Sequence, residues 1–239
     1  MIVLKIDKIT KNFGGLTALQ QVSLDVFEGQ IKSVIGPNGA GKTTLFNIIS
    51  GLILPNAGRI FFCGKDITGN VPEENARIGI GRTFQVTKPF LNMTVLQNVM
   101  IGALKDTSNI GHSRKKAMEI LKFLNMEKIK DVFPGNLTVE DRKRLELGRA
   151  LALNPSLLLL DEVMAGLNPS EVEDFKKILN DIRKRGTTIL LIEHVLHAVL
   201  SLSDEVVVLN YGEKIFDGGP KEIVKDQRVI EAYLGEDFL

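Results

Sequence analysis

A glycine-rich stretch at residues 36–44 carries the residue types needed to hold the phosphates of a nucleotide. Its sequence, Gly-Pro-Asn-Gly-Ala-Gly-Lys-Thr-Thr, fits the pattern G-x-x-x-x-G-K-[ST]. Glycines let successive backbone N–H groups turn toward phosphate oxygens, and a helix that begins there adds the positive end of its dipole. Lys42 supplies a charge for the β- and γ-phosphates, and Thr43 supplies a hydroxyl ligand for Mg²⁺. The pattern predicts nucleotide binding by Asn38, Gly39, Ala40, Gly41, Lys42, Thr43 and Thr44.

A pair of carboxylates, Asp161 and Glu162, follows the apolar run Leu157–Leu160. Such a pair on its own is more often a helix cap or a solvated turn. Behind a phosphate loop, however, an acidic pair at the carboxyl end of a strand lies where open α/β sheets bind ligands. We therefore expect Asp161 to bind the Mg²⁺ shell and Glu162 to polarise the water that attacks the γ-phosphate.

Apolar runs and helical spacing predict the elements that position these residues. An apolar run at 31–35 leads into the phosphate loop, and a helix is expected from Lys42 to Gly51. Similar runs at 157–161 and 188–192 alternate with helical patterns, which favours an α/β fold around a parallel sheet. Further elements are expected as strands at 3–9, 22–26, 59–62 and 78–85, and as helices at 94–104, 113–124 and 138–153.

The helix expected from Ser170 has the clearest end signals. Ser170 and Glu173 have the spacing of a capping box, and Gly186 lies just past the helix end. One face carries apolar residues at helical spacing, namely Val172, Phe175, Leu179 and Ile182. Strands at 206–209 and 214–216 then predict a terminal hairpin, and residues 220–239 predict a short helical tail.

Composition restricts the partners. The 239 residues are 44% hydrophobic and carry 30 basic and 29 acidic side chains, so the formal charge is only +1. No long-range field favours a polyanion, and no nucleic-acid partner is expected. The N-terminus lacks the pattern of a signal peptide, and no apolar run approaches the roughly 18 residues that a membrane helix needs. Any role at a membrane therefore depends on a partner.

Over nearly its full length the chain resembles the nucleotide-binding subunits of ABC transporters. The resemblance rests on the phosphate loop, the Asp161–Glu162 pair and three further positions. It implies that Phe13 stacks on adenine, that Gln85 contacts the metal and the attacking water, and that His194 contacts the γ-phosphate. It also implies ATP and Mg²⁺ as cofactors and a loop, Ala165–Asn168, that crosses between two subunits.

The resemblance also implies an architecture, which is a single ABC ATPase domain over residues 1–239. Its fold class is α/β, with a P-loop NTPase (RecA-like) parallel-sheet core and an N-terminal antiparallel β subdomain. An α-helical subdomain is expected as an insertion at residues 86–150. Such a subunit is peripheral to the cytoplasmic face of the cell membrane. Its partners are a second ATPase subunit, identical or paralogous, transmembrane permease subunits and, indirectly, a solute-binding protein.

The signature sequence departs from the family pattern Leu-Ser-Gly-Gly-Gln. Here it reads Leu137-Thr138-Val139-Glu140-Asp141, in which Thr138 keeps the hydroxyl and can cap the helix that follows. The resemblance implies that Thr138 and Glu140 face the ATP of the opposite subunit. Carboxylates at that place oppose an anion, and the basic residues available to offset them are Arg142, Lys143 and Arg144.

Within the family, several segments are similar to the ATPases of branched-chain amino acid importers. These are residues 82–90, 93–95, 165–169 and 231–236. The ending, residues 233–238, is also similar to the ATPase that powers lipopolysaccharide export. The favoured function is ATP hydrolysis that powers transport of branched-chain amino acids or a related small solute. The alternatives are another ABC system, such as that exporter, and a soluble ABC ATPase that is not a transporter.

Overall fold

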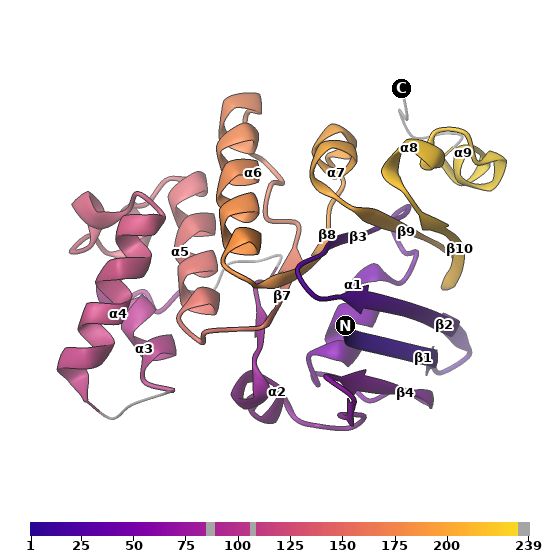
Figure 1. Ribbon diagram of the computed structural model, residues 1–239, viewed down its shortest axis with the longest axis horizontal. Helices are drawn as coiled ribbons and strands as arrows, with labels where there is room; N and C mark the ends of the chain where they lie inside the picture. Colours follow the sequence, from indigo (N-terminus) through magenta and orange to yellow (C-terminus); the bar gives the residue numbers. More distant parts are fainter. Residues whose placement is uncertain (85–88, 106–108, 234–239) are drawn as a thin grey trace.

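The N-terminal part of the chain forms an antiparallel sheet. The computed structural model describes residues 1–84, 89–105 and 109–233. Within these ranges, four strands pair in the order β2-β1-β4-β5, all antiparallel. Their bounds are Ile2–Phe13 (β1), Leu16–Phe27 (β2), Ala57–Phe62 (β4) and Lys65–Asp66 (β5). Figure 1 shows this sheet beside α1 (Lys42–Ile49), at one end of the molecule.

A second, mainly parallel sheet lies at the centre of the molecule. Its order is β10-β9-β3-β8-β7-β6, and only β10 runs antiparallel to its neighbour. The bounds are Ile31–Ile35 (β3), Ile80–Arg82 (β6), Leu157–Asp161 (β7), Thr188–Ile192 (β8), Glu205–Asn210 (β9) and Glu213–Gly218 (β10). Every residue of β3, β7 and β8 is buried, which explains why these strands are mostly apolar. The buried polar exceptions are Lys32, Ser33, Asp161 and Thr188.

The two faces of the parallel sheet belong to different cores. One face, with Val34, Leu159 and Leu190, packs with α1 and the antiparallel sheet. The opposite face, with Leu158 and Leu191, packs with α6 (Pro169–Lys184) and with the helices of the middle of the chain. Because neighbouring residues of a strand point to opposite faces, both cores meet at the same strands. The mixed α/β architecture is the expected one.

Helices from the middle of the chain pack together on one side. They are α3 (Val95–Ala103), α4 (Ile110–Phe123) and α5 (Val139–Leu151), and the 3₁₀ turns η1 (Glu127–Ile129) and η2 (Pro134–Asn136) lie between α4 and α5. Figure 1 shows them at the end of the molecule opposite the β9–β10 hairpin. The helices confirm the expected elements to within a few residues. The division of the chain into a core and an insert at 86–150 stays a prediction.

Two local expectations were wrong. The strand expected at 78–85 is the short β6, and a helix, α2 (Pro72–Ile78), precedes it. Proline at the first helical position and Gly79 at φ 108 after the last are helix-end signals that explain α2. In α6 the cap is not Ser170 with Glu173. Asn168 accepts from Glu171 N–H, because Pro169 suits the first helical position and so places the cap one residue earlier.

The expected hairpin is followed by two short helices in the described residues up to 233. The strands β9 and β10 form the hairpin, and α7 (Leu196–Leu202), which had no prediction, precedes it. The tail contains α8 (Pro220–Ile223) and α9 (Gln227–Tyr233). In the part of the chain that the structure describes, no helix combines the length and the apolar character needed to cross a bilayer.

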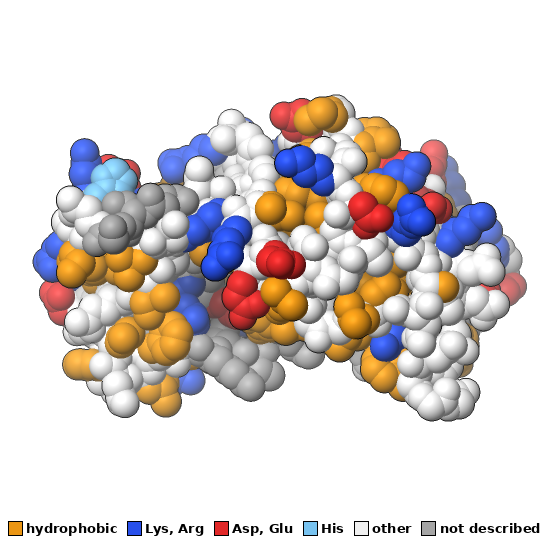
Figure 2. All heavy atoms as spheres, turned by 90° about the horizontal axis from the view of Figure 1, so that it is seen from below, with side chains coloured by type: hydrophobic (Ala, Val, Ile, Leu, Met, Phe, Trp, Pro, Cys, Tyr) orange, Lys and Arg blue, Asp and Glu red, His pale blue; other side chains and the backbone are white. Residues whose placement is uncertain are grey.

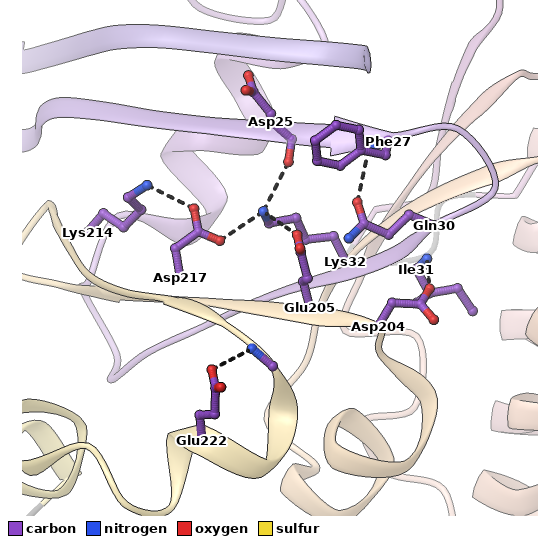
Figure 3. A network of polar contacts seen from close by, with 11 residues as sticks. Asp25, Phe27, Gln30, Ile31, Lys32, Asp204, Glu205, Lys214, Asp217 and Glu222 are labelled. Carbon is purple, nitrogen blue, oxygen red and sulfur yellow. Dashed lines mark hydrogen bonds and ion pairs between the residues drawn. The ribbon is translucent and has the colours of Figure 1, made fainter. Parts of the chain in front are cut away.

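A buried lysine ties the two sheets together (Figure 3). The side chain of Lys32 in β3 is 3% exposed, and its ammonium donates to the backbone oxygen of Asp25 in β2 at 3.0 Å. It also pairs with Glu205 at 3.0 Å and with Asp217 at 2.9 Å. Burial by itself would raise the pKa of Asp217, but the contacts with Lys214 and Lys32 outweigh it and lower that pKa. The network fixes the β9–β10 hairpin against β2.

Candidate nucleotide site

An open hollow of ≈ 400 Å³ lies at the carboxyl ends of β3, β7 and β8. The phosphate loop forms its floor between β3 and α1. The hollow gathers most of the predicted site residues from separate parts of the chain. Its lining consists of Phe13, Leu16, Thr17, Ala18, Asn38, Gly39, Ala40, Gly41, Lys42, Thr43, Thr44, Glu162, His194 and Tyr211.

The phosphate loop needs its glycines for space as well as for conformation. Gly41 has φ 101, and a Cβ there would stand 2.5 Å from the backbone oxygen of Ala18. A Cβ on Gly36 would likewise collide with the backbone oxygen of Leu209. Lys42 is buried over the loop and donates to the backbone oxygens of Gly36 at 2.6 Å and Pro37 at 2.9 Å. The lysine is therefore held over the floor of the hollow.

Phe13 stands at the end of β1, on the rim of the hollow. Its side chain is 49% exposed, and the Lys11 ammonium lies 5.0 Å from the ring centroid. An aromatic ring that is open to solvent on a rim can stack on a planar base. The structure thus places Phe13 where contact with adenine is feasible.

Asp161 is the last residue of β7 and is almost fully buried. Its Oδ2 pairs with Arg82 at 3.2 Å, and Arg82 also donates to Ser50 Oγ at 2.6 Å. Burial raises the pKa of Asp161, while Arg82 opposes that shift. Among the described residues, its buried Oδ1 has no hydrogen-bond partner. This orphaned oxygen and the hydroxyl of Thr43 are hard oxygen donors, which suit Mg²⁺.

Glu162 and His194 meet at the mouth of the hollow. Glu162 Oε1 lies 2.9 Å from His194 Nε2, and their side chains are 14% and 40% exposed. Each residue follows one of two neighbouring parallel strands, because Glu162 comes directly after β7 and His194 comes two residues after β8. The backbone of Glu162 is left-handed, with φ 52, and its N–H donates to the backbone oxygen of Ile192 at 2.9 Å.

Gln85 lies outside the described residues, but the residue before it is held by a buried acid. Phe84 N–H donates to Glu146 Oε1 of α5 at 2.6 Å. Burial raises the pKa of Glu146 to about 7, although the hydrogen bond from Phe84 opposes the shift. The helix α5 is thereby joined to the strand end that leads to Gln85.

Comparisons with known proteins show the family of the chain. Residues 19–165 match the ABC transporter family. The chain belongs to the ABC transporter family. As a cassette of this family it binds nucleotide and is an ATPase. Residues 213–239 match a further family, described as branched-chain amino acid ATP-binding cassette transporter.

Three similar proteins show how much of the cassette is shared. The high-affinity branched-chain amino acid transport ATP-binding protein BraF of Pseudomonas aeruginosa is 38% identical, over 98% of both chains. The solved cassette MJ1267 in its ADP conformation is 36% identical, with a TM-score of 0.90, over 99% of this chain and 100% of that one. The dimeric cassette MJ0796 is 26% identical, with a TM-score of 0.83, over 91% and 98%.

The signature residues of the cassette lie apart from the hollow of their own chain. Thr138 caps α5 by accepting from Asp141 N–H at 3.1 Å, and its hydroxyl donates to Asp141 Oδ2 at 2.9 Å. Glu140 pairs with Arg144 one turn along the helix. Burial raises the pKa of Glu140, and Arg144 opposes that shift. Of the three basic residues expected to offset Glu140, Arg144 is the one that pairs with it.

Several contacts of the site escaped the sequence analysis. Tyr211, at the tip of the β9–β10 hairpin, lines the hollow together with Leu16, Thr17 and Ala18 of β2. Arg82 pairs with Asp161, and Lys143 donates to the backbone oxygen of Glu162 at 2.7 Å. Glu193 accepts from Met164 N–H at 2.7 Å. Only the position of Glu193 beside His194 offered a signal, because the other contacts join distant parts of the sequence.

Proposed function

We propose that this cassette hydrolyses ATP·Mg²⁺ in the hollow and thereby powers uptake of branched-chain amino acids through separate permease subunits. The observation that carries the proposal is the Glu162–His194 contact of 2.9 Å at the mouth of a phosphate-loop hollow. A carboxylate can accept a proton from an attacking water, and a neighbouring imidazole can hold that carboxylate in position. The experiment that tests the proposal is ATP-driven uptake of leucine, isoleucine and valine by vesicles that contain the whole transporter.

The roles of the residues follow from where they lie. Lys42 and the N–H groups of the loop bind the β- and γ-phosphates, while Phe13 stacks on adenine. Thr43, Asp161 and Gln85 would hold Mg²⁺, which neutralises charge on the phosphates when bound. Glu162 accepts the proton of the attacking water. His194 orients Glu162 through the contact of 2.9 Å and contacts the γ-phosphate.

The cargo is proposed from two sources of support. The match of residues 213–239 is to a family described by branched-chain amino acid transport. The name of BraF, which is similar over almost the entire chain, gives the same cargo.

Transport of amino acids needs subunits that span the membrane. Within its described residues this chain has no helix that could span one. We therefore place it at the cytoplasmic face of the membrane, bound to permease subunits that are served by a solute-binding protein.

A second copy, or a paralogue, would complete the site. The cassette MJ0796 has been solved as a dimer. Thr138 and Glu140 lie at the N-terminal end of α5, away from the hollow of their own chain. A helix N-terminus carries partial positive charge and suits an anion, so we propose that it faces the γ-phosphate of the partner's ATP. Glu140 then weakens closure of the dimer.

Replacing Val139-Glu140-Asp141 by Gly-Gly-Gln should strengthen ATP-dependent dimerisation about fivefold in a Glu162→Gln background. Two unit charges ~4 Å apart at an effective dielectric of ~20 interact by about 4 kcal/mol, and pairing with Arg144 and solvent reduce this to about 1 kcal/mol. Sedimentation with Mg·ATP measures the change. The single variant Glu140→Gln removes the charge of Glu140 but keeps a side chain of nearly the same size. It therefore separates the effect of the charge from the effect of removing the side chains. Equal or weaker dimerisation in the replaced protein would mean that the acidic signature only caps its helix.

The face for the permease is proposed on the helical side of the molecule. Phe90, Leu91 and Met93 are exposed between β6 and α3, whereas Val95 and Val99 of α3 are buried. Arg149 lies 4.8 Å from the centroid of the Phe90 ring. In the view of Figure 2, hydrophobic side chains gather at the end of the molecule that α3 and α4 form. We propose that residues 86–150 form a unit whose exposed apolar residues receive a cytoplasmic segment of the permease.

A cysteine at Asn92 is expected to crosslink to a cytoplasmic loop of the cognate permease. Asn92 is exposed beside Leu91 and Met93, in the centre of the proposed contact. The exposed native Cys63 is first replaced by serine. A cysteine at Lys221 on α8, far from α3 in Figure 1, serves as the matched control. Crosslinking from Lys221 but not from Asn92, in an assembled and active complex, would place the permease elsewhere.

A further inference from the structure

Two charged side chains that take no part in the proposed chemistry lie beneath the Glu162 loop, Glu193 fully buried and Lys143 partly buried. Glu193 is 1% exposed, and its carboxylate accepts from Met164 N–H at 2.7 Å and from His194 N–H at 3.3 Å. Lys143 of α5 donates from its ammonium to the backbone oxygen of Glu162 at 2.7 Å. Between them, these side chains reach both ends of the Glu162–Met164 segment and the backbone of His194.

The segment that they hold is under backbone strain. Glu162 has φ 52, a left-handed conformation that is uncommon for a residue with a side chain and is typically kept only by surrounding contacts. Its N–H donates to Ile192 O at 2.9 Å, and its carbonyl accepts from Ala165 N–H at 3.3 Å as well as from Lys143. Loss of a contact to this peptide therefore frees Glu162 to turn away from His194.

The two charges also support each other. Burial lowers the pKa of Lys143, and the charge of Glu193 is the largest influence that opposes this shift. Burial likewise raises the pKa of Glu193 to about 7, and Lys143 opposes it. Glu146, Glu162 and Asp161 also face Lys143. The Lys143 ammonium thus lies among four carboxylates at the junction of α5 with β7 and β8.

We propose that Lys143 and Glu193 are positioning residues that hold Glu162 against His194 in the geometry for hydrolysis, and that Lys143 links α5 to this geometry. The inference rests on the proposed role of Glu162. Neither residue lines the hollow, so neither is expected to contact nucleotide. Because Lys143 is on the helix that begins at the signature, a shift of α5 would move the carbonyl of Glu162.

Lys143→Met is expected to lower kcat about 10- to 100-fold and to leave the Kd for Mg·ATP within twofold. A misplacement of about 1 Å in a reacting group can cost up to ~10²-fold in rate. Lys143→Arg should recover most of the rate, since a guanidinium also donates to the carbonyl. The matched control is Lys184→Met, because Lys184 pairs with Asp181 on the surface of α6. Purified full-length protein is assayed for steady-state hydrolysis and for binding of a fluorescent ATP analogue.

A second pair of variants tests the positioning role of Glu193. Glu193→Gln keeps an oxygen that can accept from Met164 N–H, whereas Glu193→Ala removes it. The alanine variant should therefore lose more kcat than the glutamine variant, again with little change in Kd. These variants decide the matter if Lys143→Met fails to fold.

Two results would overturn the inference. One is a wild-type kcat in Lys143→Met, and the other is an equal loss of kcat and of nucleotide affinity in each folded variant. The Glu162→Gln enzyme separates this failure from a failure of the proposed function. If Glu162→Gln is inactive while Lys143→Met is fully active, only the positioning role of Lys143 and Glu193 is wrong. If Glu162→Gln is active, the role assigned to Glu162 is wrong as well.

Discussion

Glu162→Gln is expected to slow ATP hydrolysis by about 10²–10⁴-fold and to leave Mg·ATP binding intact, because it removes a general base but no phosphate contact. Glutamine has nearly the same shape as glutamate, and its side-chain oxygen can still accept a hydrogen bond from His194. The variant should also accumulate as a closed dimer, since ATP stays bound but is not cleaved. Phosphate release and sedimentation with Mg·ATP measure the two effects.

Glu173→Gln is the matched control for this change. Glu173 pairs with Lys176 at 2.7 Å on the exposed surface of α6, away from the hollow. It should retain the wild-type turnover. Wild-type turnover in purified Glu162→Gln enzyme would remove Glu162 from the proposed mechanism.

Lys42→Ala is expected to weaken Mg·ATP binding about 10- to 150-fold. Hydrogen bonds to charged groups contribute roughly 1.5–3 kcal/mol each, and Lys42 is the buried ammonium over the loop floor. In this structure it donates to the backbone oxygens of Gly36 and Pro37, so its removal also loosens the loop. Titration with a fluorescent ATP analogue measures the loss.

Lys177→Ala provides the comparison for Lys42→Ala. The Lys177 side chain is 74% exposed and pairs with Asp174 on α6. It should bind nucleotide like the wild type. Unchanged affinity in Lys42→Ala, in a protein with wild-type thermal stability, would show that the phosphates bind elsewhere.

The central strands could be predicted from sequence because their signal is local. The runs at 31–35, 157–161 and 188–192 coincide with β3, β7 and β8, since these strands are buried on both faces and are therefore mostly apolar. The phosphate loop is equally local, because consecutive residues provide both its glycines and its lysine. Thr138 as the cap of α5 followed from the same kind of short-range pattern.

Short elements were harder to predict, because several residues compete for one boundary. At α6, Ser170 and Asn168 both have a capping side chain followed by a glutamate at the right spacing. Pro169 decides in favour of Asn168, because its fixed φ suits the first helical position. At α2, the apolar residues near Ile78 were interpreted as part of a strand, although Pro72 and Gly79 mark the ends of a helix.

The supporting contacts of the site could not be predicted at all. Arg82 and Asp161 lie 79 residues apart, and Phe84 and Glu146 lie 62 apart, so no spacing rule connects them. The resemblance to ABC cassettes supplied Phe13 and His194, which the structure brings to the hollow. Gln85, which the resemblance also supplied, lies outside the described residues. The role proposed for Lys143 could not be predicted either, because the oxygen that it binds belongs to the backbone of Glu162.

Uptake of labelled leucine by proteoliposomes tests the proposed function most directly. The vesicles contain the cognate permease subunits and this chain with enclosed Mg·ATP, and the solute-binding protein is outside. We predict accumulation of leucine that requires enclosed ATP, is reduced by unlabelled isoleucine or valine, and disappears with Glu162→Gln. ATP hydrolysis in an assembled complex without leucine, isoleucine or valine uptake would contradict the proposed cargo. Uptake that persists with Glu162→Gln would contradict the proposed site.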